Sequence, residues 1–174
     1  MPGKAREQAF DAFVAAHLAG LRRTAYLMVG DWTRADQVIE RSLADLYRDH
    51  VDLTDAQASL TRARTLLIGQ VSHAHRLTLD GADLVDSGGP GANPEERLMA
   101  ALDQVPVQER AAVVLARFNH LDDAEISTIL DADARELVLE ALAHLRRVLA
   151  RTGDTLVLEE EVAADNEAFK RPGA

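Results

Sequence analysis

Cysteine is absent from this chain of 174 residues, and aromatic residues make up only 4% of it. Without cysteine the chain forms no disulfide and no thiolate metal site, which is typical of proteins from a reducing cytoplasm. Hydrophobic residues nevertheless make up 47% of the chain. With so few rings, the core must be built from Leu, Val, Ile and Ala, which favours helices over sheets. The composition therefore predicts an all-α, cytoplasmic protein.

Long hydrophobic runs and catalytic motifs are also lacking. No apolar run approaches the roughly 20 residues that cross a bilayer, and the opening MPGKAREQAF lacks the apolar centre of a signal peptide. No glycine-rich phosphate loop, GxSxG or HExxH motif is present. His73 and His75 form an HxH pair, but their side chains would point about 200° apart on a helix. We therefore expect no enzyme activity, no cofactor, no metal and no membrane association.

A basic segment is missing as well. The formal net charge is −10, and residues 1–80 hold ten acidic and ten basic residues. Each of the later segments, 81–92, 93–152 and 153–174, is net acidic. A general nucleic-acid binder carries a basic patch. The charge distribution therefore does not favour nonspecific binding to nucleic acid.

Apolar residues recur at helical spacing in two stretches that are separated by a glycine-rich segment. Residues 5–79 predict a small domain made of a three-helix bundle, and residues 93–151 predict a second helical domain. Between them, residues 80–92 contain four glycines and no periodicity, which indicates a flexible linker. Residues 152–174 predict an acidic C-terminal tail.

Helix starts can be predicted from capping patterns, in which a short polar residue precedes an acid or amide by three positions. Pro94 within the first turn strengthens one of these patterns, and Pro106 predicts the start of a further helix. We expect capping pairs at four places: Asn93 with Glu96, Asp122 with Glu125, Thr33 with Asp36, and Thr54 with Gln57.

The most informative segment is LDDAEISTIL, residues 121–130, followed by residues 131–143. The first part predicts the entry to a helix-turn-helix, and the second part would then be the helix that reads DNA. Yet residues 131–143 contain one basic residue against four acidic ones. Leu137, Val138 and Leu139 cannot all face inward on one helix, so we expect at least one of them to be exposed or covered by a partner.

Two segments resemble sigma factors of the extracytoplasmic-function (ECF) group in the sigma-70 family. Residues 25–49, AYLMVGDWTRADQVIERSLADLYRD, resemble region 2 of that family. Residues 101–130, ALDQVPVQERAAVVLARFNHLDDAEISTIL, resemble region 4, and Pro106 and Arg110 match its L-P-x-x-x-R pattern with Val105 in place of the Leu. The resemblance covers residues 8–151 and is greatest to an actinobacterial subgroup.

The resemblance implies a region 2-like bundle and a region 4-like helix-turn-helix domain. In the family, region 2 binds the β′ coiled coil of the RNA polymerase core and opens the −10 promoter element, while region 4 binds the flap and reads the −35 element. The implied polymerase-binding residues are Asp36, Gln37, Val38, Glu40 and Arg41. The implied −10 DNA residues are Arg62, Arg64 and Arg76. The implied −35 helix carries Arg135, Glu136, Leu139 and Glu140.

Gln37, Glu40 and Arg41 differ from the residues usual in region 2 of the family, but region 4 is where this chain departs most from the family pattern. A few residues are missing from the turn and the recognition helix, and acidic or apolar residues replace basic and hydroxyl residues. Phosphate contacts need Lys or Arg. We therefore expect a sigma-factor-like transcription regulator with impaired −35 reading. It would act through protein contacts with the polymerase core, with another regulator, or with itself as a homodimer through residues 137–149.

Two other functions stay open. The alternative is a functional ECF sigma factor that directs RNA polymerase to promoters and initiates transcription. A small-molecule-binding helical regulator would need a cleft between the two domains.

Overall fold

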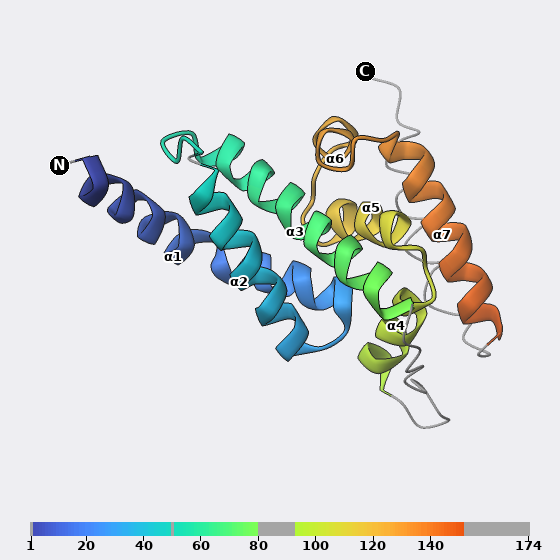
Figure 1. Cartoon of the computed structure of the whole chain (residues 1–174). Coiled ribbons are helices and arrows are strands. Elements are labelled where there is room, and N and C mark those ends of the chain that lie inside the picture. Colours follow the sequence, from blue (N-terminus) through green and yellow to red (C-terminus); the bar gives the residue numbers. More distant parts are fainter. Residues whose placement is uncertain (1, 50, 80–92, 152–174) are drawn as a thin grey trace, which may run out of the picture.

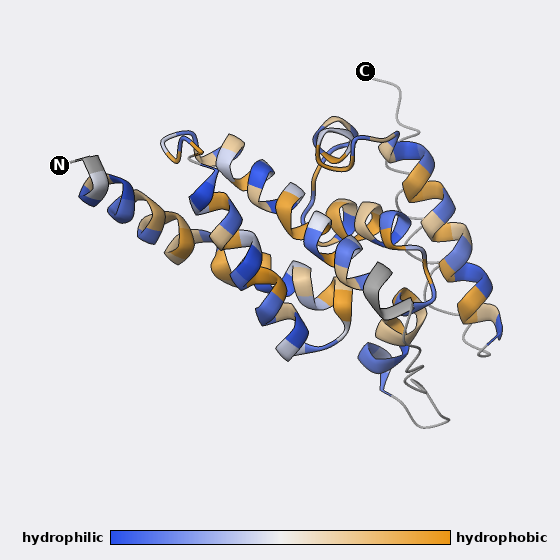
Figure 2. Cartoon of the chain, in the orientation of Figure 1, coloured by the Kyte–Doolittle hydropathy of each residue, from blue (hydrophilic) through white to orange (hydrophobic). Residues whose placement is uncertain are grey.

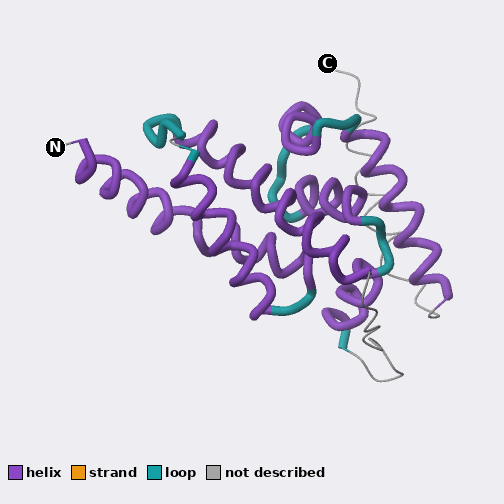
Figure 3. The backbone as a smooth tube through the Cα atoms, viewed as in Figure 1, coloured by secondary structure: helices purple, strands orange, loops and turns teal. Residues whose placement is uncertain are grey.

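Seven helices follow one another in the computed structural model, which describes residues 2–49, 51–79 and 93–151 (Figure 1). They are α1 (Pro2–Val29), α2 (Trp32–Arg48), α3 (Ala56–Leu79), α4 (Pro94–Asp103), α5 (Val107–Arg117), α6 (Asp123–Leu130) and α7 (Ala134–Arg151). Within these described ranges no strand is present, as Figure 3 shows. The predicted all-α fold class is confirmed. The predicted linker (80–92) and acidic tail (152–174) lie outside the described residues.

Two of the four predicted capping pairs are present in full. Asn93 Oδ1 accepts from the backbone N of Glu96 at 2.8 Å, while Asn93 N donates to the Glu96 carboxylate at 3.0 Å. Asp122 and Glu125 form the same reciprocal pair at 2.9 and 3.1 Å. Each pair satisfies backbone donors that the first helical turn leaves free. These two sites therefore fix the starts of α4 and α6.

The other two pairs were predicted wrongly, because nearby aspartates cap the helices instead. Asp31 Oδ1 accepts from Arg34 N at 2.8 Å, so α2 begins before Thr33. Asp55 Oδ1 accepts from Ala58 N at 3.0 Å at the start of α3, while the Thr54 hydroxyl donates to Asp52. Aspartate is a better cap than threonine. Helices α2 and α3 therefore begin directly after these two aspartates and not at the predicted threonines.

Helix α5 lies at the centre of the molecule and packs against α1, α3, α6 and α7 (Figure 1). Its residues 109–115 are all buried, and Figure 2 shows hydrophobic residues on α5 and on the helices around it. One hydrophobic cluster joins buried side chains from all seven helices. The largest fully buried members are Met28, Leu46, Leu67, Leu102, Leu115 and Ile126. The core is thus aliphatic, as the composition predicts.

The helices of the two predicted domains pack directly against each other. Helix α1 contacts α4 and α5, and α3 contacts α5 and α6. Helix α3 ends at Leu79 and α4 begins at Pro94, next to the predicted limits of 79 and 93. The division into folding units 5–79 and 93–151 stays a prediction. In the structure, however, both segments contribute to one shared core.

Candidate functional site

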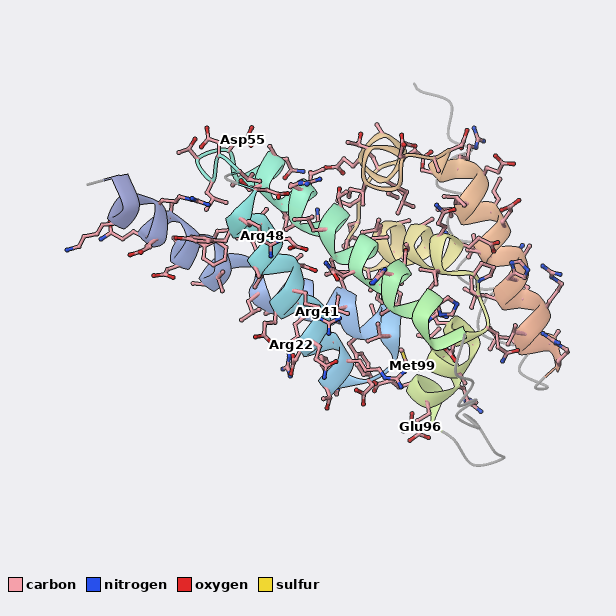
Figure 4. The ribbon with its side chains drawn as sticks, in the orientation of Figure 1. Arg22, Arg41, Arg48, Asp55, Glu96 and Met99 are labelled. Atoms are coloured by element: carbon pink, nitrogen blue, oxygen red, sulfur yellow. The ribbon has the colours of Figure 1, made fainter. Side chains whose placement is uncertain are left out.

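The α2 residues that the resemblance assigns to polymerase binding differ in their accessibility. Gln37, Glu40 and Arg41 are exposed, and Figure 4 labels Arg41 on this helix. Val38 is only 5% exposed and belongs to the core. Buried and exposed residues recur along α2 at helical spacing. Val38 therefore packs in the core, while the other three side chains face solvent. Val38 is therefore not available to a partner on this surface.

Asp36, the remaining residue of this set, is held by an arginine of α1. Arg22 Nε lies 2.5 Å from Asp36 Oδ1, and Nη2 lies 2.9 Å from Oδ2, so the contact is bidentate. Hydrogen bonds from Arg22 lower the pKa of Asp36, and the same contact raises the pKa of Arg22. The Arg22 guanidinium also lies 4.9 Å from the centre of the Trp32 ring, which stacks on Tyr26. These contacts fix the orientation of Asp36.

A cleft of about 470 Å³ opens beside this aromatic stack. Arg22, Tyr26 and Trp32 line one side of it, and Met99 and Phe118 line the other. Figure 4 labels Arg22 and Met99. A cleft between the two predicted domains was left open by the sequence, but none of these lining residues could be identified from it. They lie far apart in sequence and meet only because α4 and α5 pack against α1.

The basic residues predicted to meet −10 DNA are on α3, and two of them have acidic neighbours. Arg62 Nη2 lies 2.6 Å from a carboxylate oxygen of Asp49. Arg64 is half-buried, and the desolvation lowers its pKa, while the charge of Glu125 opposes that shift. Arg76 belongs to α3 as well, but its side chain lies outside the described side chains. Arg62 is therefore paired with an acid within the molecule, whereas the half-buried Arg64 only lies within the electrostatic influence of Glu125.

Helix α6 lies against α3 and brings Glu125 to that surface. The Gln57 side-chain amide donates to Glu125 Oε1 at 2.7 Å. Arg64 of α3 also lines a small pocket of about 100 Å³, together with His17 and Asn119. The Arg64 Nε is buried without a hydrogen-bond partner. The helix that the resemblance assigns to promoter opening is thus partly covered by the helix before the predicted DNA-reading helix.

Helices α6 and α7 are joined by residues 131–133. Asp131 adopts a left-handed conformation with φ 51°, which ends α6, and Asp133 Oδ1 accepts from Glu136 N at 3.0 Å at the start of α7. The Ser127 hydroxyl oxygen accepts from Ala134 N at 3.1 Å. The two aspartates therefore act as turn and capping residues, which explains part of the acidic charge in this segment.

The residues predicted on the −35 helix all lie on the exposed side of α7. Leu139 is 61% exposed, whereas Leu137 and Val138 are partly buried. The expectation that at least one of these three apolar residues is exposed is confirmed. The exposed members of the predicted set are Arg135, Glu136, Leu139 and Glu140. The accessible surface of this half of α7 is thus mixed acidic and apolar.

Arg110 belongs to the P-x-x-x-R part of the region 4 motif, but the sequence alone does not show what its side chain contacts. It is only 4% exposed and lies on α5. Its guanidinium donates to Met28 O at 2.7 Å, to Asp103 O at 2.8 Å and to Val105 O at 3.2 Å. Burial lowers its pKa, partly opposed by Asp103. Arg110 therefore caps carbonyls at the ends of α1 and α4 together and joins the two predicted domains.

Two further polar contacts join distant segments. The Asn119 side-chain amide donates to the Thr24 hydroxyl at 2.9 Å, and Thr24 is 3% exposed on α1. His144 Nδ1 of α7 contacts the Glu109 carboxylate of α5. Neither pair is visible in the sequence, because the partners are 95 and 35 residues apart.

Metal ligands do not gather in the described part of the chain. Among residues 2–49, 51–79 and 93–151, no group of three His, Asp or Glu side chains is arranged to hold a metal ion. His73 and His75 are both exposed on α3. None of the described helices is long and apolar enough to cross a membrane.

Comparison with known proteins gives a match in structure but none in sequence. No family model and no curated protein matches the chain. A similar solved structure is the sigma factor RpoE in complex with the anti-sigma factor NepR, from Bartonella quintana. The two chains are 16% identical, the TM-score is 0.59, and the match covers 81% of this chain and 96% of the other. The chain therefore has an all-α, sigma-factor-like fold.

Proposed function

We propose that this chain is a sigma-factor-like transcription regulator that acts through protein–protein contacts and has lost direct reading of the −35 element. The expected partner is the RNA polymerase core or another transcription regulator. The sigma-factor-like fold supports the general class. The observation that carries the finer proposal is the packing of α6 on α3, which covers part of the surface that would meet promoter DNA.

Charge on the predicted DNA-reading helix supports the same proposal. Phosphate contacts supply most of the affinity of a DNA-binding protein and require Lys or Arg side chains. The exposed N-terminal half of α7 offers Arg135 but also Glu136 and Glu140. Asp131 and Asp133 precede the helix, where phosphates commonly bind helix N-termini. DNA approaching this end would meet more negative than positive charge.

The basic side chains of α3 give little compensation. Arg62 is paired with Asp49, and the half-buried Arg64 faces the charge of Glu125. Before either arginine can bind a phosphate, the neighbouring carboxylate must move away, or the phosphate must approach that carboxylate closely. Both changes reduce the electrostatic gain from DNA binding. Promoter opening by this surface would therefore first require α6 to separate from α3.

The exposed surface of α2 is the proposed contact for polymerase. Gln37, Glu40 and Arg41 face solvent there, and the bidentate contact with Arg22 orients Asp36. Polar and charged residues at such a surface determine partner choice more than affinity. The family pattern has other residues at several of these positions. We therefore expect the partner preference of this surface to differ from that of a typical ECF sigma factor.

The test combines binding to purified core polymerase, run-off transcription and DNA binding at low salt. We expect polymerase or regulator binding without specific initiation and with little DNA affinity. Arg41→Glu should weaken polymerase binding, whereas Lys4→Glu, an equal charge change at an exposed site on α1, should not. Specific initiation that depends on this protein would instead establish the alternative, a functional ECF sigma factor. A chain that binds neither polymerase nor any regulator of transcription would overturn both.

A further inference from the structure

The outer face of α7 carries a charge pattern that is complementary to itself. Glu136 and Glu140 lie four residues apart, and Arg147 and Arg151 also lie four residues apart. Glu140 and Arg147 are seven positions apart, so the order along the helix is acid, acid, base, base with symmetric spacing. At 100° per residue these four side chains share one flank of the helix. All four residues are exposed.

Beside this flank runs a stripe of accessible small and apolar side chains. Leu139 is 61% exposed, and Ala143 and Ala150 are exposed at spacings of four and seven residues. The opposite side of α7, which packs on the rest of the molecule, contributes Ala134, Ala141, Leu145 and Val148 to the core. In Figure 1, α7 lies at the edge of the molecule, away from α1 and α2. Figure 2 shows alternating hydrophilic and hydrophobic bands along it.

Arg147 Nε and Arg151 Nε donate to the backbone carbonyls of Ala143 and Arg147 at 3.3 Å, but none of the four charges has an ion-pair partner within α7. Residues three or four positions apart are neighbours on a helix surface. At that spacing Glu136 meets Glu140, and Arg147 meets Arg151, so each pair is repulsive. Glu140 and Arg147 are seven residues apart, about 10 Å along the axis, which is too far for an ion pair. No ion pair joins any of the four to another described residue.

We propose that α7 is a self-association surface, on which a second copy of this chain binds with its own α7 antiparallel. Antiparallel alignment about a twofold axis near Ala143 places Glu136 opposite Arg151 of the second copy. It also places Glu140 opposite Arg147, and symmetry repeats both pairs. Parallel alignment would instead bring the two acidic ends together and the two basic ends together, so the opposite charges could not meet. Charge complementarity therefore selects both the occupant and its direction.

The apolar stripe fits the same arrangement. In the antiparallel register Leu139 of one copy lies against Ala150 and the aliphatic stem of Arg146 of the other. Small alanines allow two helices to approach closely, and arginine stems cover apolar surface while their charges stay in water. The burial of Leu139 removes the most exposed of the large hydrophobic side chains described. The proposal thus accounts for both the charge pattern and the exposed leucine.

The contact is small, which determines the expected affinity. Helix α7 has 18 residues, and at 1.5 Å per residue it is about 27 Å long. A contact between two such helices lies at the low end of specific interface sizes, where association is weak and transient. We expect a dissociation constant on the order of 10–100 μM at low salt. Because the pairs lie at a solvent-exposed rim, the dimer should weaken as ionic strength rises.

Sedimentation equilibrium of the full chain and four charge variants tests the proposal. Glu136→Arg with Glu140→Arg makes the flank wholly basic, and Arg147→Glu with Arg151→Glu makes it wholly acidic. Each double variant alone should self-associate about 10- to 100-fold more weakly. An equimolar mixture of the two should form heterodimers, because opposite flanks then face each other. The variant with all four changes keeps the net charge and should regain the homodimer.

A matched control separates the local effect from the change in net charge. Glu7→Arg with Asp11→Arg makes the same change in charge at exposed positions of α1, also four residues apart. This control should leave the dissociation constant unchanged within about threefold. Circular dichroism of each variant checks that the helices remain folded. These experiments need no polymerase, so they test self-association through residues 137–149 separately from the polymerase binding proposed above.

Several outcomes would overturn the proposal. One is a natural chain that stays monomeric at concentrations on the order of 0.5 mM at low salt. Another is a dimer that both double variants retain, or a mixture of them that forms no heterodimer. A chain that dimerises only after deletion of residues 153–174 would show that its own C-terminal segment occupies this face instead.

Discussion

Replacement of Arg110 by methionine should destabilise the whole molecule, because this one side chain joins helix ends from both predicted domains. Methionine keeps much of the length and volume of arginine but removes the charge and every donor. Arg110 donates to carbonyl oxygens of Met28, Asp103 and Val105 at 2.7–3.2 Å. The first two of these residues lie at the C-terminal ends of α1 and α4, where carbonyls have no partner within the helix.

The magnitude follows from these contacts. A hydrogen bond from a charged donor contributes about 1.5–3 kcal/mol net, and loss of the donor leaves buried carbonyls unsatisfied. The burial that lowers the pKa of Arg110 offsets part of this, because methionine carries no charge to desolvate. The ion pair to Asp103 adds little, since that carboxylate is 70% exposed. We expect a net loss of about 3 kcal/mol, or roughly 10 °C in Tm for a domain of this size.

Urea and thermal unfolding followed by circular dichroism measure this loss. Arg41→Met is the matched control, because Arg41 is exposed on α2 and should change stability by no more than about 0.5 kcal/mol. Arg110→Lys keeps the charge but loses the fork of donors, so it should lie between the two. If Arg110→Met costs less than about 1 kcal/mol, or no more than the control, the proposed joining role of Arg110 is wrong.

Three further predictions address other sites. Asp36→Asn should lower the Tm at pH 7. Folding lowers the pKa of Asp36, so its stabilisation is fully present above the ordinary pKa of 3.8 and is lost as pH falls through the lower folded pKa. The Tm values of the natural chain and the variant should therefore converge in acid. A Tm difference that does not change with pH would contradict the ion-pair explanation. Asp122→Ala should lower the free energy of unfolding by about 1 kcal/mol through loss of the α6 cap. The control Asp123→Ala, which changes the neighbouring residue and keeps the cap, should lower it less. Glu136→Lys with Glu140→Arg should raise nonspecific DNA affinity and add a salt dependence; an unchanged affinity would show that charge is not what prevents binding.

Much of the fold could be predicted from local sequence. The aliphatic composition, the helical periodicity and the glycine-rich interval at 80–92 indicated two groups of helices, and the capping patterns at Asn93 and Asp122 located two helix starts. These features act over one or two turns, so neighbouring residues are sufficient to determine them. The predictions at Thr33 and Thr54 failed for a related reason. Asp31 and Asp55 could cap the same helices as the two threonines, and the capping pattern alone does not show which residue is preferred.

The candidate site could be predicted only in part. The sequence identified α2, α3 and α7 as surfaces to examine, and it showed the acidic, apolar character of residues 131–143. Helical periodicity also required that Leu137, Val138 and Leu139 could not all be buried. It did not reveal that Val38 is internal while its neighbours are exposed, nor that Arg110 joins α1 to α4 and α5.

The sequence by itself therefore determined the class of fold, the approximate positions of the helices and the charge of each segment. Only the tertiary structure decided which of those charges remain available. Arg62 and Arg64 look free in the sequence, but folding brings them close to Asp49 and Glu125. Periodicity and capping are local properties of the chain, whereas a charge is available or compensated according to neighbours that folding brings from distant segments.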